Sequence, residues 1–203
     1  MRACKTRTWN RRWQPRRLSA RALWRTGAAL VALAVFPAAL AAQTWRGLIV
    51  APEARCAPYE RSDYTYAPAP LEALLVRELG GVYAPYSGSC LKDRRETDVE
   101  HIVALSEAHD SGLCGRSELD KVQFANDTLN LTLATPAVNR EQKRHFDAAE
   151  WLPEKNRCWF AARVLAVRLK HRLTIDRAEA QALEGVLSRC RSLDLEQHCS
   201  FAE

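Results

Sequence analysis

The 203-residue sequence predicts a single α+β domain stapled by disulfide bonds, and three observations support this prediction. Two short apolar segments of strand length lie in the middle of the chain, and a helix signal directly follows the second. The last part of the chain contains two amphipathic helical segments joined by a short linker. Six cysteines, an even number, follow residue 42. A composition of 47% apolar and 27% charged residues excludes a disordered chain and a polytopic membrane protein.

Residues 1–42 have the composition of a secretory signal peptide. They hold nine basic residues and no acidic residue, and residues 27–42 form an uncharged, apolar run that ends in Ala39-Leu40-Ala41, a typical cleavage site. A membrane anchor is the alternative, but this run spans only 16 residues and contains Pro37, whereas a spanning helix needs about 20 residues. The paired arginines at 11–12 and 16–17 are compatible with a twin-arginine signal. We expect a secreted or periplasmic protein that begins near Ala42 or Gln43 and has no membrane segment after cleavage.

Removing this leader changes the charge of the protein. The whole chain has a formal net charge of +6, but residues 43–203 hold 21 basic and 24 acidic residues, a net charge of −3. The remaining domain therefore has no overall attraction to nucleic acid. In an exported chain, its six cysteines predict three disulfides, and structural zinc is the weaker alternative because no C-x-x-C pair is present.

The elements of residues 43–143 follow from periodicity and from helix and turn signals. We expect an irregular segment at 43–69, a helix at 71–79 that ends at Gly80-Gly81, and a loop at 82–97. An apolar strand at 99–105 is followed by a polar segment with a short helix near 119–124. Residues 128–134 alternate between polar and apolar and predict a half-buried strand. Thr135-Pro136 then starts a helix that includes Asn139 and Lys143.

Two helices form the C-terminal part of the domain. Apolar stripes mark one helix at 159–172 and a second helix after Asp176-x-x-Glu179, which resembles a capping box. The linker of about four residues predicts an antiparallel hairpin, so Cys158 and Cys190 lie at the same end and should pair. The pairing of Cys56, Cys90, Cys114 and Cys199 remains open at this stage.

The predicted strand–strand–helix unit carries residues suited to metal-assisted hydrolysis. Glu100-His101 lies on the first strand, Asn130 on the second strand and Asn139 in the helix. Taken singly, each has an ordinary structural explanation, such as a buried histidine, a hydrogen-bonding amide or an exposed helix residue. Together they offer an imidazole with a near-neutral pKa, which can act as a general base, and hard oxygen ligands suited to Mg²⁺.

These residues resemble the HNH nuclease family, and the wider run resembles an exported bacterial branch of it. The matching segments, which cover roughly residues 80–190, are Glu100-His-Ile-Val-Ala-Leu-Ser-Glu-Ala-His-Asp-Ser-Gly112, Phe124-Ala-Asn-Asp127, Val138-Asn-Arg140 and Asp147-Ala-Ala-Glu-Trp-Leu-Pro153.

The resemblance implies a ββα-metal core at about 97–150 within a nuclease domain at 43–203, flanked by helices and the C-terminal hairpin. It implies that Glu100 and Asn139 hold Mg²⁺, or Mn²⁺ or another divalent metal, while His101 acts as the base and Asn130 orients it. The implied substrate is nucleic acid, DNA first and RNA second, cleaved with little sequence specificity.

Several residues keep two interpretations. Arg140 and Lys143, together with Arg144, are candidate phosphate contacts or a solvated helix face. Asp98 is a further metal ligand or a loop acid, and His109 and His145 are either site residues or structural residues. Glu100 stands where related motifs more often have Asp. The alternative function is a secreted, disulfide-stapled binding module with a degenerate nuclease site, and the oligomeric state is open.

Overall fold

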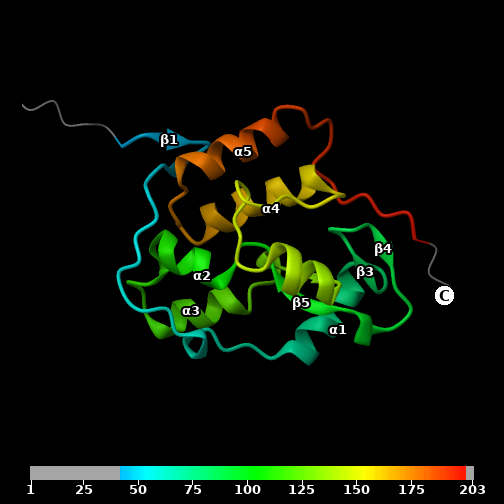
Figure 1. The fold of residues 1–203 in the computed structure, drawn as a ribbon. Helices are drawn as coiled ribbons and strands as arrows, with labels where there is room; N and C mark the ends of the chain where they lie inside the picture. Colours follow the sequence, from blue (N-terminus) through cyan, green and yellow to red (C-terminus); the bar gives the residue numbers. More distant parts are fainter. Residues whose placement is uncertain (1–41, 200–203) are drawn as a thin grey trace, which may run out of the picture. The chain divides into compact units, whose positions relative to one another are not determined.

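The computed structural model describes residues 42–199, and residues 1–41 of the predicted signal peptide lie outside them. Three antiparallel pairs of strands are present in this part of the chain: β1 (Thr44–Trp45) with β2 (Leu48–Ile49), β3 (Tyr83–Ala84) with β4 (Ser89–Cys90), and β5 (Asp98–His101) with β6 (Leu131–Ala134). The α-helices are α1 (Pro68–Glu78), α2 (Leu105–Ala108), α3 (Glu118–Ala125), α4 (Arg157–Lys170) and α5 (Arg177–Leu187). Between them lie 3₁₀ turns η1 (Arg61–Asp63), η2 (Arg94–Glu96) and η4 (Thr128–Asn130), and π-helical segments η3 (His109–Leu113) and η5 (Ala137–Lys143). The mixture of helices and small sheets is that of an α+β fold (Figure 1).

The predicted helices in the first half of the domain are present. Helix α1 has prolines in its first turn, where the missing N–H costs nothing, and ends just before the glycine pair. Helix α3 begins after Ser117, whose hydroxyl accepts a hydrogen bond from the Asp120 N–H in a capping box. The expectation of plain loops is wrong in two places, because residues 43–69 include the β1–β2 hairpin and residues 82–97 include the β3–β4 hairpin.

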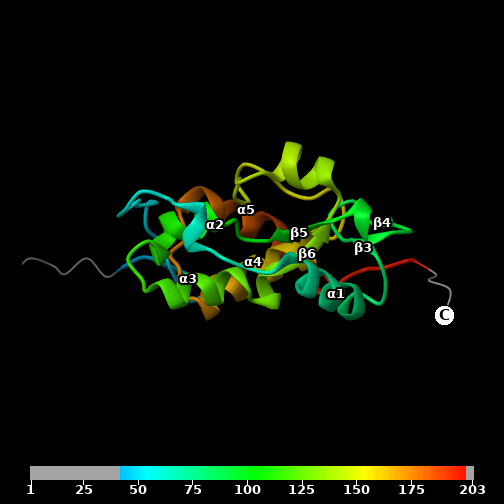
Figure 2. The ribbon, with the colours of Figure 1, turned by 90° about the horizontal axis from the view of Figure 1, so that it is seen from below.

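The central strand pair differs from the prediction in length and in burial. Strand β5 ends at His101, and the chain then turns so that the predicted strand residue Leu105 begins α2. Strand β6 is buried on both faces rather than on one. Leu131 and Leu133 pack against Leu75 of α1, whereas Ala134 belongs to the main core. Figure 2 shows the reason, since α1 lies on one side of β5–β6 and the yellow-green η5 lies on the other.

The helix that follows β6 starts where Thr135-Pro136 predicts. The Val138 N–H donates to Thr135 Oγ1, and the Asn139 N–H donates to the Thr135 carbonyl. The segment then widens, because the Arg144 N–H donates to the Asn139 carbonyl five residues back, a π-type hydrogen bond. Arg144 ends the segment with a φ of 52°. This irregular turn carries three of the predicted site residues: Asn139, Arg140 and Lys143.

The C-terminal hairpin is present and is closed by a disulfide. Phe160, Val164 and Val167 of α4 and Leu183 and Val186 of α5 enter the core, and the two helices lie side by side (Figure 1). The linker covers residues 171–176, somewhat longer than expected. Asp176 caps α5 by accepting hydrogen bonds from the N–H groups of Ala178 and Glu179.

The predicted Cys158–Cys190 disulfide is confirmed, with Cα atoms 5.7 Å apart. The pairs left open by the sequence are Cys56–Cys114 and Cys90–Cys199. Cys56–Cys114 ties the segment after β2 to the end of η3, and Cys90–Cys199 ties β4 to the C-terminal segment.

Among residues 42–199, no helix has the length and apolar character needed to cross a bilayer.

Candidate functional site

His101 is the last residue of β5 and is held in one tautomer. Its Nε2 lies 2.9 Å from the carbonyl oxygen of Ala125 at the end of α3. A carbonyl can only accept, so Nε2 carries the proton and Nδ1 is left as a basic lone pair. The side chain is only 6% exposed, and burial lowers the pKa of His101 to about 4, so the ring is neutral at physiological pH. The Tyr66 ring packs edge-on against it, with ring centroids 5.0 Å apart.

Glu100 faces the opposite side of β5, as the alternation of side chains along a strand requires. Its Oε1 lies 2.9 Å from Nζ of Lys143 in η5, and both side chains are buried. Burial raises the pKa of the Glu100 carboxyl, and the Lys143 ammonium opposes this shift. Lys143 has no exposed surface, so it faces Glu100 rather than a phosphate in solvent, in contrast to the expected phosphate contact.

Asp98 lies on the same face of β5 as Glu100 and joins two residues of η5. The Asn139 Nδ2 donates to Asp98 Oδ2 at 3.1 Å. The Arg140 guanidinium donates to both carboxylate oxygens of Asp98, at 2.8 and 2.6 Å. Asp98 is therefore a strand residue that binds two side chains of η5. Arg140, a predicted phosphate contact, already forms an ion pair with Asp98. The structure brings Glu100 and Asn139 to adjacent elements, β5 and η5, through these contacts.

Asn130 does not touch the His101 ring. It lies in η4, one residue before β6, and is fully buried. Its Oδ1 accepts from the Val103 N–H at 2.8 Å and its Nδ2 donates to the Val103 carbonyl at 3.1 Å. Its own carbonyl accepts from the Ile102 N–H. Asn130 thus fixes the backbone immediately after His101, and it lies in a 3₁₀ turn rather than on the second strand, where the sequence predicted it.

A surface hollow opens at the end of β5. It is lined by Tyr59, Glu100, His101, Ser106, Arg144 and His145, among others. Arg144 and His145 are exposed, so His145 belongs to the hollow and Arg144 supplies a free cationic side chain there. The sequence did not indicate Tyr59 as a site residue, because it lies in the irregular segment before α1, far along the chain from the other lining residues.

His109 is a structural residue. It is fully buried, its Nδ1 lies 2.8 Å from the Tyr64 hydroxyl, and its Nε2 donates to the Ala57 carbonyl at 2.8 Å. Both ring nitrogens are therefore occupied within the fold, and the structural interpretation of this histidine holds. Its contacts anchor the segment that precedes α1 to η3.

Comparisons with known proteins identify the family of the chain and do not address its individual site residues. An uncharacterized secreted protein of the fungus Arthroderma benhamiae is 28% identical over 114 residues, which is 55% of this chain and 56% of that protein. The chain thus matches about half the length of this curated relative, and the relative is fungal rather than bacterial. This secreted relative and the disulfides indicate an extracellular location.

No solved structure matches the chain. Residues 59–183, well over half of the chain, match the family described as "GmrSD restriction endonucleases, C-terminal domain". The chain therefore belongs to this nuclease-related family.

Proposed function

We propose that the chain is an exported, metal-dependent endonuclease of the HNH type that hydrolyses phosphodiester bonds in DNA, with RNA as a second substrate and little sequence specificity. The geometry of His101 carries the proposal. A neutral imidazole with its Nε2 proton fixed on a backbone carbonyl, at the edge of a hollow, has the form of a general base. Membership of a restriction-endonuclease family supports the reaction class.

His101 takes the proton from the attacking water in this proposal. Its Nδ1 accepts no hydrogen bond from the described residues, and the Ala125 carbonyl stabilises the imidazolium that forms when Nδ1 is protonated. Asn130 holds the Ile102–Val103 backbone and thereby limits movement of the histidine. The low pKa of His101 keeps the base unprotonated without help from a neighbouring carboxylate.

Glu100 and Asn139 are the residues that would hold a divalent cation, and their free oxygens fit one. Lys143 lies beside Glu100 Oε1, which leaves Oε2 as the carboxylate oxygen that would face the cation. Asn139 donates through Nδ2, and its Oδ1 is uncommitted in the described part of the chain. Two hard oxygen ligands suit Mg²⁺ or Mn²⁺, which keep several waters. The bound metal supplies charge stabilisation for the phosphoryl group and the leaving oxygen.

The substrate phosphate requires a cationic contact that is not already neutralised. Lys143 and Arg140 each have a carboxylate partner, Glu100 and Asp98. Arg144 is exposed at the hollow, and the free-standing guanidinium suits bidentate binding of a phosphate. We therefore assign the main phosphate contact to Arg144, with Arg140 as a secondary contact that exchanges Asp98 for substrate.

A cleavage assay tests the proposal. Purified protein from residue 43 onward is incubated with supercoiled plasmid, single-stranded DNA and RNA, in chelator and in Mg²⁺ or Mn²⁺. Cleavage should vanish in chelator and return with the metal, and His101→Ala should lower the rate by about 10²–10⁴-fold. The matched control is His198→Ala, because His198 is exposed and lies outside the hollow. Full cleavage in excess chelator, or full activity of His101→Ala, would contradict the assignment.

The alternative is a secreted binding module whose nuclease site no longer works. The Glu100–Lys143 ion pair favours it, because the carboxylate already has a buried cationic partner without any metal. This alternative predicts binding of nucleic acid with no cleavage under any metal condition. The same incubation, followed by a gel-shift measurement, separates the two functions.

A further inference from the structure

The irregular stretch before α1, residues 54–66 with η1 inside it, reaches the proposed active site at two points. Tyr59 lines the hollow itself, and Tyr66 packs edge-on against the His101 ring, with centroids 5.0 Å apart. The guanidinium carbon of Arg61 lies 4.8 Å from the centroid of the Tyr66 ring. Two aromatic rings and one cation therefore stand beside the proposed base, and the proposed mechanism uses none of them.

Tyr59 and Arg61 both have surface available for a ligand. Tyr59 is half-buried, because its ring packs against Tyr64 at a centroid distance of 5.6 Å while the rest of it lines the hollow. Arg61 is exposed and forms no ion pair within residues 42–199, and one of its N–H groups donates to the Tyr64 carbonyl at 2.6 Å. Arg140, in contrast, is already paired with Asp98. A partly open ring suits a base, and a guanidinium without a carboxylate partner suits a phosphate.

The stretch is fixed to the neighbouring helical segments at several places. Its anchors come from η3, from α3 and from the residue that caps the C-terminus of α3. They are the Cys56–Cys114 disulfide, the contacts of His109 with the Ala57 carbonyl and the Tyr64 hydroxyl, the Lys121–Asp63 ion pair, and the hydrogen bond from Asn126 Nδ2 to the Thr65 carbonyl. The aromatic rings are thus in place before a ligand binds, so little of the binding energy is lost in ordering them.

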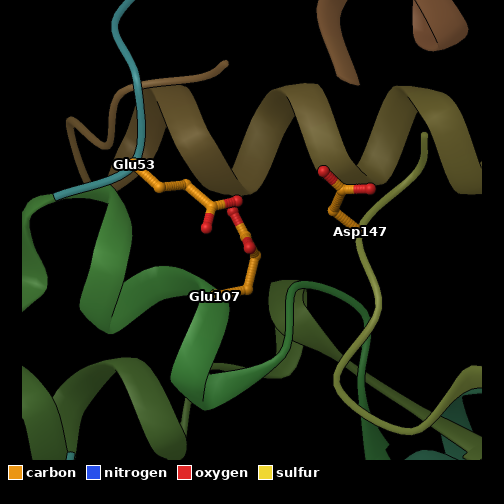
Figure 3. Close-up of side chains that lie close together, drawn as sticks. All are labelled: Glu53, Glu107 and Asp147. Atoms are coloured by element: carbon orange, nitrogen blue, oxygen red, sulfur yellow. The ribbon is translucent and has the colours of Figure 1, made fainter. Parts of the chain in front are cut away.

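The chain is also held where it enters this stretch. Figure 3 shows the carboxylate of Glu53 facing that of Glu107 in α2, with Asp147 turned toward the same space. Burial and the charge of Glu107 raise the pKa of Glu53 to about 7, so the two carboxyl groups can share a proton near neutral pH. The Arg55 guanidinium donates to both carboxylate oxygens of Asp110, at 2.7 and 2.6 Å. The start of the stretch is therefore attached to α2 and η3.

The size and depth of the hollow favour an unpaired nucleotide. Its volume is about 160 Å³, well below the roughly 300 Å³ of pockets that enclose drug-sized ligands. A hollow of this size accommodates a single planar group and not a base pair. His101 is only 6% exposed, so a scissile phosphate must enter the hollow to come near it. A single strand bends freely enough to do so, whereas a duplex must first unstack and unpair a base.

We propose that Tyr59 and Arg61 bind an unpaired nucleotide of single-stranded DNA next to the scissile phosphate, with the base against the Tyr59 ring and the adjoining phosphate on Arg61. Tyr66 supports Arg61 through the cation–π contact. The inference rests on the proposed function, because it places the scissile phosphate at His101. Stacking accepts every base, since each has a π face, and this suits a nuclease with little sequence specificity. The net charge of −3 on residues 43–203 makes binding depend on such local contacts.

Binding of fluorescent DNA to the protein from residue 43 onward, measured by anisotropy in chelator, tests the stacking contact. The probes are single-stranded oligo(dT), a strand of the same length made of abasic sites, and the oligo(dT)–oligo(dA) duplex. Tyr59→Ala should weaken binding of oligo(dT) by about 5–150-fold, because the stacking of a base is lost. Tyr59→Phe keeps the ring and should bind as wild type. The abasic strand should bind equally to wild type and Tyr59→Ala.

The salt dependence of the same binding tests Arg61. Arg61→Ala should reduce the slope of log K against log salt concentration by about 0.7, the value for one phosphate contact on a single strand. Arg189→Ala is the matched control, because Arg189 is likewise exposed and lies outside the hollow, beyond the end of α5. It should keep the slope of wild type. An unchanged Tm in each variant shows that the substitution acts on binding and not on folding.

Equal binding of oligo(dT) and the duplex, or wild-type binding by Tyr59→Ala, overturns the proposal. Tighter binding of oligo(U) than of oligo(dT) overturns the choice of DNA. These measurements need no turnover, so they are separable from the proposed function. A protein that binds oligo(dT) through Tyr59 and cleaves nothing in any metal fails as a nuclease and retains the binding site. One that cleaves single strands and duplex equally, with full activity in Tyr59→Ala, remains a nuclease and lacks the site.

Discussion

Replacing Lys143 by methionine should destabilise the domain strongly, because the substitution leaves Glu100 buried without a cationic partner. The Lys143 side chain has 0% and the Glu100 side chain 7% of its surface exposed, and their Nζ and Oε1 atoms are 2.9 Å apart. No other hydrogen bond reaches these two atoms within residues 42–199. Methionine has a similar length and keeps the packing, so the change removes the charge and little else.

Breaking a buried ion pair by removing one partner costs about 3–5 kcal/mol. For a domain of this size, 1 kcal/mol lowers the Tm by about 2–4 °C, so Lys143→Met should lower the Tm by about 6–20 °C. The double variant Glu100→Gln/Lys143→Met removes both charges and should recover most of the loss. Neutral pH is required, because acidification would protonate Glu100 in the single variant.

The assay is denaturant and thermal unfolding of wild type, both single variants and the double variant, in chelator and in Mg²⁺. If Glu100 is a metal ligand, Mg²⁺ should raise the Tm of Lys143→Met more than that of wild type, because the metal replaces the missing cation. A loss below about 1 kcal/mol in Lys143→Met, or strict additivity in the double variant, would show that the pair is not coupled and refute the reasoning.

Three further predictions concern single residues. Asn139→Ala should weaken metal binding, so that cleavage falls at low Mg²⁺ and recovers partly at high Mg²⁺; a rate independent of Mg²⁺ contradicts its assignment as a ligand. Asn130→Ala leaves the buried Val103 N–H without its acceptor and should cost about 1–3 kcal/mol by denaturant unfolding, with a lower kcat even where the protein remains folded. Burial opposes ionisation of Asp127, but the hydrogen bond from His171 and other contacts lower its pKa to about 2. A depressed carboxyl pKa contributes stability that is present above the unfolded-state pKa and is lost as the pH falls through the folded value. Wild type should therefore lose stability between about pH 4 and pH 2, and Asp127→Asn should lack this component of the pH profile; identical acid profiles would count against the His171 contact.

Local signals in the sequence were sufficient for most elements of the fold. A proline and a capping residue marked the starts of α1 and α5, because they remove or satisfy the first free N–H groups of a helix. The hairpin of α4 and α5 followed from two apolar stripes and a short linker, and it led directly to the Cys158–Cys190 pair. The placement of His101 on a strand and of Asn139 on the following helical segment was also correct.

Burial depended on contacts that the sequence does not contain. Strand β6 alternates between polar and apolar residues, yet α1 and the main core cover both of its faces, so Thr132 is as buried as its apolar neighbours. The alternation of polar and apolar residues describes a single strand. Whether one or both faces of that strand are buried depends on how many other elements pack against it, and the rest of the chain decides this.

The sequence by itself determined the order of the longer helices and of β5 and β6, the acid–histidine pair on β5 and one disulfide, because these depend on spacing along a few residues. Only the tertiary structure decided which charges meet. It placed Lys143 on Glu100 instead of in solvent and Asn130 on the Val103 backbone. It also collected Glu53, Glu107 and Asp147 from three separate segments. The energy of a charge depends on its solvent exposure and on the partners within a few ångströms, and both are fixed only when distant segments pack together.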